Sequence, residues 1–167
     1  VIKINNSTVS ILDQINTQPN KLYRLDNFCT NQSEIKSFIN DINNYKAGCY
    51  IISGDTGFGV THLINAACNY LNNKGKVIYV TSQWLIQILK TCKSDKALYL
   101  LREEFIAYDL IAIDNTQVLY RKALMYQQFI IDLIERCKTE HKWLILGNSD
   151  QKKDFTRSKK NIGLIKL

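Results

Sequence analysis

Short apolar segments alternate along the chain with segments whose apolar residues recur at helical spacing. A short apolar run bounded by polar residues or glycine is typical of a buried strand, and the helical spacing is typical of an amphipathic helix. Strands that alternate with helices predict an α/β fold of three layers, in which a parallel sheet has helices on both faces. The predicted strands are 47–54, 76–82, 109–114, 142–150 and 162–167.

The predicted helices fill the intervals between these strands. One helix follows Ser33, which we expect to cap it, and Ile35, Phe38 and Ile42 fall on one face of that helix. Another follows Ser82, which we expect to cap it. The remaining helical segments are 60–73, 97–108 and 121–138.

The composition restricts the setting in which the protein works. Residues 1–22 are polar with scattered aliphatic side chains and predict an N-terminal extension, so that the folded core covers 23–167. The chain has no apolar run of about twenty residues, and no membrane span is expected. Its five cysteines occur singly, without a C-x-x-C pair, and there are two histidines. We therefore expect reduced thiols, no zinc site and a cytoplasmic location.

The segment SGDTGFGVTHL, residues 53–63, nearly matches the phosphate-binding motif G-x-x-x-x-G-K-[ST]. It lies between a predicted strand and a predicted helix, which is the context that the motif requires. Glycines at 54, 57 and 59 let successive N–H groups converge on phosphate oxygens, and the helix adds its positive N-terminal end. A tight strand-to-helix turn without a ligand is the alternative, and the further motifs described below favour the nucleotide loop.

Two positions lack groups that hydrolysis needs. Val60 stands where the motif has a lysine, whose ammonium contacts the terminal phosphates and stabilises charge in the transition state. Asp114 follows the third strand and is a candidate magnesium ligand together with Thr61. The residue after Asp114 is Asn115, and an amide cannot act as a general base. We therefore predict nucleotide binding with hydrolysis at background.

A second polar cluster follows the fourth strand, where Asn148, Ser149 and Asp150 could reach a terminal phosphate or close a turn. His62 begins the helix after the loop, and a packing or capping role is favoured for it over a catalytic one. The predicted nucleotide-binding residues are Gly54, Asp55, Thr56, Gly57, Phe58, Gly59, Val60, Thr61, His62, Asp114 and Asp150.

These segments together resemble the DnaA/Hda-like AAA+ ATPase family of bacterial replication initiators and their regulators. SGDTGFGVTHLINAACNYL resembles the Walker A region and the first helix of the family, and YDLIAIDNTQVL resembles its Walker B segment. KVIYVTSQWLIQIL resembles the strand and helix between them, and LILGNSD resembles the strand that leads to the first sensor motif. YRLDNF, residues 23–28, is similar to the entry segment that packs near the adenine.

The resemblance implies an AAA+ P-loop core with strand order 5-1-4-3-2, and ADP or ATP with Mg²⁺ as the ligand. Near the end, Ser158, Gly163 and Leu164 match the arginine-finger box of the family, but Lys159 takes the place of the arginine. A lysine lacks the planar fork with which arginine straddles phosphates. We expect a core without the helical lid and without the DNA-binding domain that DnaA carries.

Three functions are compatible with this pattern. The favoured hypothesis is a non-hydrolysing regulator or adapter of replication initiation that contacts DnaA-like partners, the helicase or DNA. A weak ATPase, in which another basic residue such as Lys74 or Lys76 replaces the missing lysine, is the second. A helicase-loader relative of the DnaC type is the third. Gln117, within the segment that resembles Walker B, and the Gly163–Leu164 pair favour the first over the third.

The net charge of +7 suits contact with nucleic acid, and one basic run lies near the C-terminus. That run contains Lys152, Lys153, Arg157, Lys159 and Lys160. Because no element for reading base edges is apparent, contacts should fall on phosphates and lack sequence preference. A solvated face is the alternative interpretation of such a short run.

Binding to DNA should therefore be weak and sensitive to salt. If about three to five phosphates are engaged, the logarithm of affinity should fall with the logarithm of salt concentration at a slope of roughly −2 to −5. Charge reversal at Lys152, Lys153 and Lys159 should flatten this slope without changing the melting temperature. A salt titration with single- and double-stranded oligonucleotides measures it, and an unaltered slope in the variant would assign the run to another role.

Overall fold

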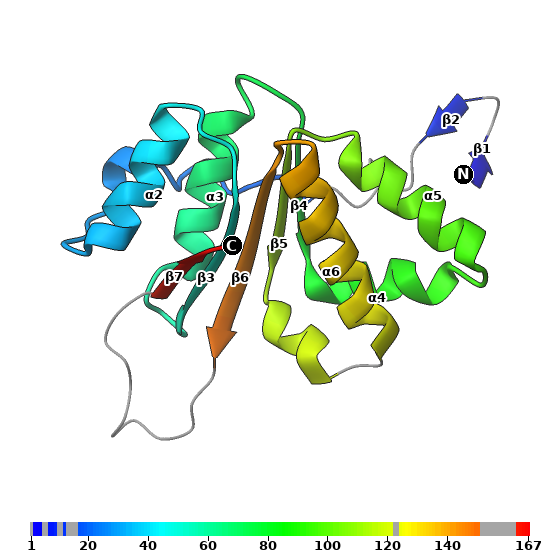
Figure 1. Ribbon diagram of the computed structural model, residues 1–167. Coiled ribbons are helices and arrows are strands. Elements are labelled where there is room, and N and C mark those ends of the chain that lie inside the picture. Colours follow the sequence, from blue (N-terminus) through cyan, green and yellow to red (C-terminus); the bar gives the residue numbers. More distant parts are fainter. Residues whose placement is uncertain (1, 5–6, 10–11, 13–16, 122–123, 151–162) are drawn as a thin grey trace.

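A computed structural model describes residues 2–4, 7–9, 12, 17–121, 124–150 and 163–167, and its centre is a five-stranded sheet (Figure 1). The strands lie in the order β4-β5-β6-β3-β7. If these five strands are numbered 1 to 5 along the chain, this is the predicted order 5-1-4-3-2 read from the other edge, so the predicted strand order is confirmed. The strands are β3 (Cys49–Asp55), β4 (Val77–Thr81), β5 (Leu110–Asp114), β6 (Trp143–Asp150) and β7 (Gly163–Lys166).

Helices cover both faces of the sheet, as Figure 1 shows. On one face lie α2 (Ser33–Asn43) and α3 (Val60–Leu71), and on the other lie α4 (Ser82–Thr91), α5 (Asp95–Ile106) and α6 (Leu124–Thr139). Two 3-10 helices, η1 (Leu25–Asn27) and η2 (Thr116–Arg121), precede α2 and α6. A short antiparallel pair, β1 (Ile2–Ile4) and β2 (Ser7–Val9), begins the chain. Among the described residues, no helix has the length and apolar character needed to cross a membrane.

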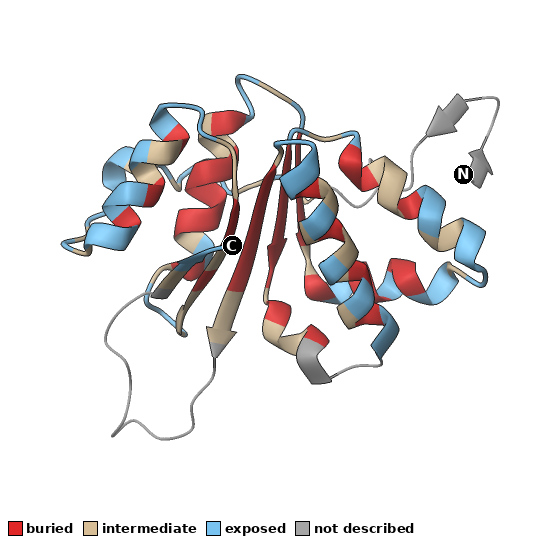
Figure 2. Ribbon diagram, in the orientation of Figure 1, coloured by how far each residue is buried: buried red, intermediate tan, exposed pale blue. Residues whose placement is uncertain are grey.

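Alternation of side chains along the strands divides the core into two halves. In β4, Ile78 and Val80 pack with α4, α5 and α6, whereas Val77 and Tyr79 pack with α2 and α3. Successive residues of a strand point to opposite faces, so a strand covered on both faces must be apolar throughout. Figure 2 shows the result, because the central strands are buried along most of their length. The continuous apolar runs in the sequence reflect this double burial.

The direction of β7 differs from the expectation of five parallel strands. The other four strands are parallel, but β7 runs antiparallel to β3, with Gly163 opposite Ser53 and Lys166 opposite Tyr50. β6 ends opposite Asp55, at the same edge where β7 begins. A strand that starts at this end of the sheet runs antiparallel to its neighbour. A parallel strand would require a connection that crosses to the opposite end of the sheet first.

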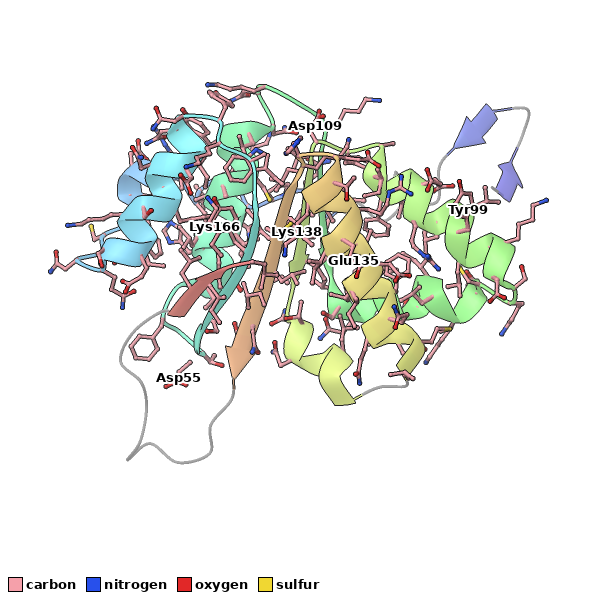
Figure 3. All side chains as sticks on the ribbon, in the orientation of Figure 1. Asp55, Tyr99, Asp109, Glu135, Lys138 and Lys166 are labelled. Atoms are coloured by element: carbon pink, nitrogen blue, oxygen red, sulfur yellow. The ribbon has the colours of Figure 1, made fainter. Side chains whose placement is uncertain are left out.

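A polar cluster fastens this last strand to α2. The Asp41 carboxylate accepts a hydrogen bond from the Tyr50 hydroxyl at 2.7 Å and pairs with the Lys166 ammonium at 2.8 Å. Figure 3 shows Lys166 on β7. Burial raises the pKa of Asp41, but the hydrogen bonds from Lys166 and Tyr50 outweigh burial, so the pKa lies below its ordinary value of 3.8. The cluster therefore depends on an ionised Asp41.

α3 lies so close to β6 that only glycine fits at one position. A Cβ on Gly147 would overlap Ile64 Cδ1 and would lie 2.7 Å from Asp114 Oδ1. Ile64 is fully buried and Asp114 is 1% exposed, so neither side chain has free space to move into. A glycine inside a strand often marks such an approach. Gly147 thereby allows α3, β5 and β6 to meet at the end of the sheet.

The Asp41 cluster predicts a specific dependence of stability on pH. The carboxyl has a lower pKa in the folded protein than in the unfolded chain, so its contribution is present above the ordinary pKa and is lost as pH falls through the folded pKa. Urea unfolding at several pH values should show that Asp41→Asn loses less stability on acidification than the wild type. Glu135→Gln, at an exposed position of α6, is the control and should keep the wild-type dependence. If the free energy of unfolding falls equally with pH in Asp41→Asn and in the wild type, the role of ionised Asp41 is contradicted.

Gly147→Ala should destabilise the fold by about 1–3 kcal/mol, the usual cost of overpacking a filled core. Gly48→Ala is the matched control, because its Cβ would meet Tyr50 and Lys166 at 3.1 to 3.3 Å, which requires shifts of only a few tenths of an ångström. Its loss of stability should therefore be smaller. Denaturant unfolding measures the stability of both variants. An unchanged denaturation midpoint for Gly147→Ala would contradict the prediction, because it would mean that the neighbouring side chains make room for the added methyl group.

Candidate functional site

The loop between β3 and α3 has the backbone of a phosphate-binding loop. Gly57 and Gly59 have φ angles of 92° and 94°, in the left-handed region that glycine adopts without steric cost. The loop closes on itself through a hydrogen bond from Phe58 N to Asp55 O at 3.1 Å. α3 then begins at Val60, so the unpaired N–H groups of its first turn face the end of the sheet. Figure 3 shows Asp55 at this end.

A cavity of about 410 Å³ lies against this loop. It brings together four segments that are far apart in sequence, namely the chain before η1, the loop, the chain after β5 and the end of β6. Most of the predicted loop residues line it, whereas Gly54 and Phe58 belong to the loop but not to the lining. The lining residues are Tyr23, Asp55, Thr56, Gly57, Gly59, Val60, Thr61, His62, Asn115, Gln117 and Ser149.

The two predicted magnesium ligands lie side by side. Thr61 Oγ1 donates to Asp114 Oδ2 at 2.9 Å, across the gap between α3 and β5. Asp114 is 1% exposed, and its other oxygen accepts from the main-chain N of Asn115 at 2.8 Å. Carboxylate and hydroxyl oxygens are ligands that Mg²⁺ accepts, usually with several waters retained. Within the described ranges, no group of three or more His, Cys, Asp and Glu side chains could hold a metal ion.

Two further hydroxyl groups hold the Asp114 segment in place. The Tyr79 hydroxyl donates to the same Oδ2 at 3.1 Å. Burial, followed by the charge of Asp114, raises the pKa of Tyr79, so this group stays protonated and donates. Ser82 Oγ donates to Asp114 O at 2.9 Å. The predicted capping roles of Ser33 and Ser82 are wrong, because Gln32 and Thr81 occupy the cap positions of α2 and α4. Ser82 instead ties α4 to β5.

Positions 60 and 115, where the motifs differ from those of a nucleotide hydrolase, carry uncharged side chains. Val60 is 2% exposed and contributes an apolar wall. Asn115 has a φ of 59°, a left-handed conformation that asparagine tolerates better than most residues. No lysine or arginine lines the cavity in the part of the chain that the structure describes. The lining can therefore offer N–H and hydroxyl donors to phosphate, but no fixed positive charge.

His62 packs against the segment that enters the core. Its ring stacks on Tyr23 with centroids 4.5 Å apart, and Phe28 contacts it edge-on at 5.2 Å. Its Nε2 lies 2.9 Å from Asn27 Oδ1. These contacts support the packing role, and they place residues 23–28 beside the loop. Contact between His62 and a nucleotide stays a prediction.

Two oxygens near the site are buried without a hydrogen-bond partner among the described residues. They are Asp55 Oδ2 and Asn148 Oδ1, on adjacent strands. Ser149 N donates to Gln117 Oε1 at 3.1 Å, which joins the end of β6 to η2. Asp150 lies opposite Asp55 in the strand register, but its side chain is outside the described residues. The basic residues 152, 153, 157, 159 and 160 are also outside them.

Sequence reasoning missed three residues that shape the site. Tyr79 reaches Asp114 from the neighbouring strand, and Asn65 hydrogen-bonds the main chain of Thr61 at 2.7 Å. Gly147 provides the space that Asp114 needs. A tyrosine within an aliphatic strand and a glycine within another were the available signals. Asn65 gave no signal beyond being a polar residue among buried ones on α3.

Comparison with known proteins identifies the family. A family model described as the bacterial DnaA ATPase domain matches residues 20–161. The replication initiator DnaA of Geobacter sulfurreducens is 26% identical over 147 residues, which cover 83% of this chain and 33% of that protein. The chain thus spans about a third of the length of this relative.

Solved structures show the same fold. Domain III of the Thermotoga maritima initiation protein DnaA has a TM-score of 0.64 at 20% identity, over 82% of this chain and 63% of that one. AMPPCP-bound DnaA from Aquifex aeolicus has a TM-score of 0.62 at 23% identity, over 79% of this chain and 43% of that one. With the match of the family model over most of the chain, the protein belongs to the bacterial DnaA ATPase-domain family, and it has an AAA+ core.

Proposed function

We propose that the protein is a nucleotide-binding but non-hydrolysing regulator or adapter in the initiation of bacterial DNA replication. The observation that carries this proposal is the contrast within one cavity. The loop backbone and the Thr61–Asp114 pair are arranged as a nucleotide site requires, whereas Val60 and Asn115 lack the groups that hydrolysis requires.

Phosphate binding would rest on the backbone. The N–H groups at the start of α3 and in the glycine loop are donors for phosphate oxygens. Thr61 and Asp114 would hold Mg²⁺, which would neutralise part of the phosphate charge in a cavity that has no lysine or arginine among its described lining residues. Support comes from the family and from the Aquifex relative, which is described with AMPPCP bound. ADP or ATP is therefore the proposed ligand.

Hydrolysis would fail at two separate steps. Without a lysine at position 60, the charge that develops on the transferred phosphoryl group lacks a fixed cation. Without a carboxylate at position 115, no side chain there can take a proton from the attacking water. A single loss would slow the reaction, and the two together should reduce it to background.

An adapter needs a stable scaffold more than it needs turnover. The sheet order, both helical layers and the loop geometry are all retained despite the two changes. Within the proposal, the partners are replication proteins of the DnaA type or the helicase. The basic residues 152–160 are proposed to contact DNA phosphates without sequence preference.

Restoring the lysine should separate binding from turnover. Val60→Lys adds charge-assisted hydrogen bonds to phosphate, each worth about 1.5–3 kcal/mol, so affinity for ADP and ATP should rise roughly ten- to a hundredfold. Phosphate release should stay at background because Asn115 remains, and adding Asn115→Asp to Val60→Lys should raise it. Titration with fluorescent nucleotides, with and without Mg²⁺, and a phosphate-release assay provide the two measurements.

Val60→Met is the matched control, since it adds length without charge and should leave the affinity close to that of the wild type. Wild-type turnover of about one per second that Asp114→Asn abolishes would refute the non-hydrolysing role. Absence of nucleotide binding in both the wild type and Val60→Lys would refute the nucleotide site itself.

A further inference from the structure

The candidate nucleotide cavity has the same sign of charge as the ligand proposed for it. Among its described lining residues, Asp55 is the acidic one, and none is a lysine or an arginine. Asp114 adds a second carboxylate directly behind the lining, where its Oδ2 accepts from Thr61 Oγ1 at 2.9 Å. Asp114 is 1% exposed, so salt screens its charge poorly. An incoming phosphate therefore meets two carboxylates and no lysine or arginine from the described lining.

The Asp55 carboxylate lacks a donor among the described residues. Asp55 ends β3, and its main-chain oxygen accepts from Phe58 N at 3.1 Å, which fixes the residue at the start of the loop. The residue is partly exposed and lines the cavity, yet its Oδ2 is buried without a hydrogen-bond partner in the described part of the chain. The ion pairs between described residues do not include it. Burying such an oxygen is costly unless a donor or a cation meets it.

This charge determines what the cavity attracts first. A free nucleoside diphosphate or triphosphate carries several negative charges, and the two carboxylates repel it. A loop lysine would offset the repulsion, but position 60 holds valine. A divalent cation is attracted by the same carboxylates, and once bound it is the largest local charge and turns repulsion of phosphate into attraction. The cation should therefore bind before the nucleotide or together with it.

We propose that the Asp55 carboxylate gives this cavity affinity for a divalent cation alone and makes nucleotide binding conditional on that cation. The second part of the inference rests on the proposed function. Asp55 joins Thr61 and Asp114 as a proposed ligand, because Mg²⁺ accepts such oxygens and retains several waters. No group of three or more His, Cys, Asp and Glu side chains within the described ranges could hold a metal ion, so the cation alone should bind weakly, with a Kd on the order of millimolar.

Binding of Mn²⁺ to the full chain without nucleotide tests the first part, and the electron paramagnetic resonance signal of free Mn²⁺ measures it. Asp55→Asn removes one charge but keeps the size of the side chain and the main-chain oxygen that closes the loop. It should weaken Mn²⁺ binding about tenfold. Asp95→Asn is the matched control, because it removes the same charge from an exposed position of α5 outside the lining. It should leave the affinity unchanged.

Titration with fluorescent ADP tests the second part. With a chelator present, the wild type should bind ADP weakly, and Asp55→Asn should bind it about tenfold more tightly because one repelling charge is gone. With saturating Mg²⁺ this advantage should disappear, since the wild type then holds the cation better. Linkage requires that Mg²⁺ and ADP raise the affinity for each other by the same factor, and this factor should be smaller in Asp55→Asn.

Asp55→Glu keeps the charge, so it should retain both the Mn²⁺ affinity and the weak binding of ADP in chelator. Thermal melting checks that each variant is folded. Equal Mn²⁺ affinity in the wild type and Asp55→Asn would overturn the role of Asp55. If the wild type binds ADP equally well with chelator and with Mg²⁺, the inference fails while the nucleotide site stands. If Mn²⁺ binding behaves as expected but ADP binds under neither condition, the proposed function fails and the cation site stands.

Discussion

A buried carboxylate is the constraint on which the end of the sheet depends. Asp114 is 1% exposed, and burying an ionised group is costly unless donors surround it. Thr61, Tyr79 and the main chain of Asn115 supply these donors from α3, β4 and the turn after β5. The position of Asp114 therefore fixes how three elements meet.

Other features of the site follow from the need to give the Asp114 carboxylate space and hydrogen-bond donors. Gly147 leaves the space on β6 that the carboxylate occupies, and Ser82 holds the main chain of Asp114 from the start of α4. Asn65 hydrogen-bonds the main chain of both Thr61 and Asn20, which extends the network to the segment before α2. A carboxylate kept in place by so many contacts, in a chain that lacks the loop lysine and the second acid, is consistent with a site kept for binding rather than for turnover.

The strands and the loop could be predicted because each depends on local pattern or on a motif, whereas the strand order followed from the resemblance to the AAA+ family. Double burial gives β5 its continuous apolar run, and the loop shows its glycines directly in sequence. The direction of β7 could not be predicted, because four residues of edge strand carry no signal of direction and the outcome depends on where the preceding connection returns.

The polar network was beyond prediction for a similar reason. Ser82 has the sequence signature of a helix cap, but its hydroxyl finds a main-chain oxygen that lies 32 residues later. Asn65 and Asn20 are ordinary asparagines in sequence, and their bond joins residues that lie 45 positions apart. Such contacts exist only once the sheet has brought distant segments together. Periodicity and motif spacing describe single elements and do not report on pairs of this kind.

The most direct measurement follows the fate of ATP bound to the protein. Protein loaded with radiolabelled ATP and Mg²⁺, freed of excess nucleotide and incubated for hours, should release intact ATP when it is denatured. This result is expected because the cavity retains its phosphate donors and Thr61, whose hydroxyl bonds the buried Asp114, while Val60 and Asn115 replace the groups that drive hydrolysis. Recovery of ADP and phosphate in place of ATP, or failure of any nucleotide to remain with the protein, would contradict the account.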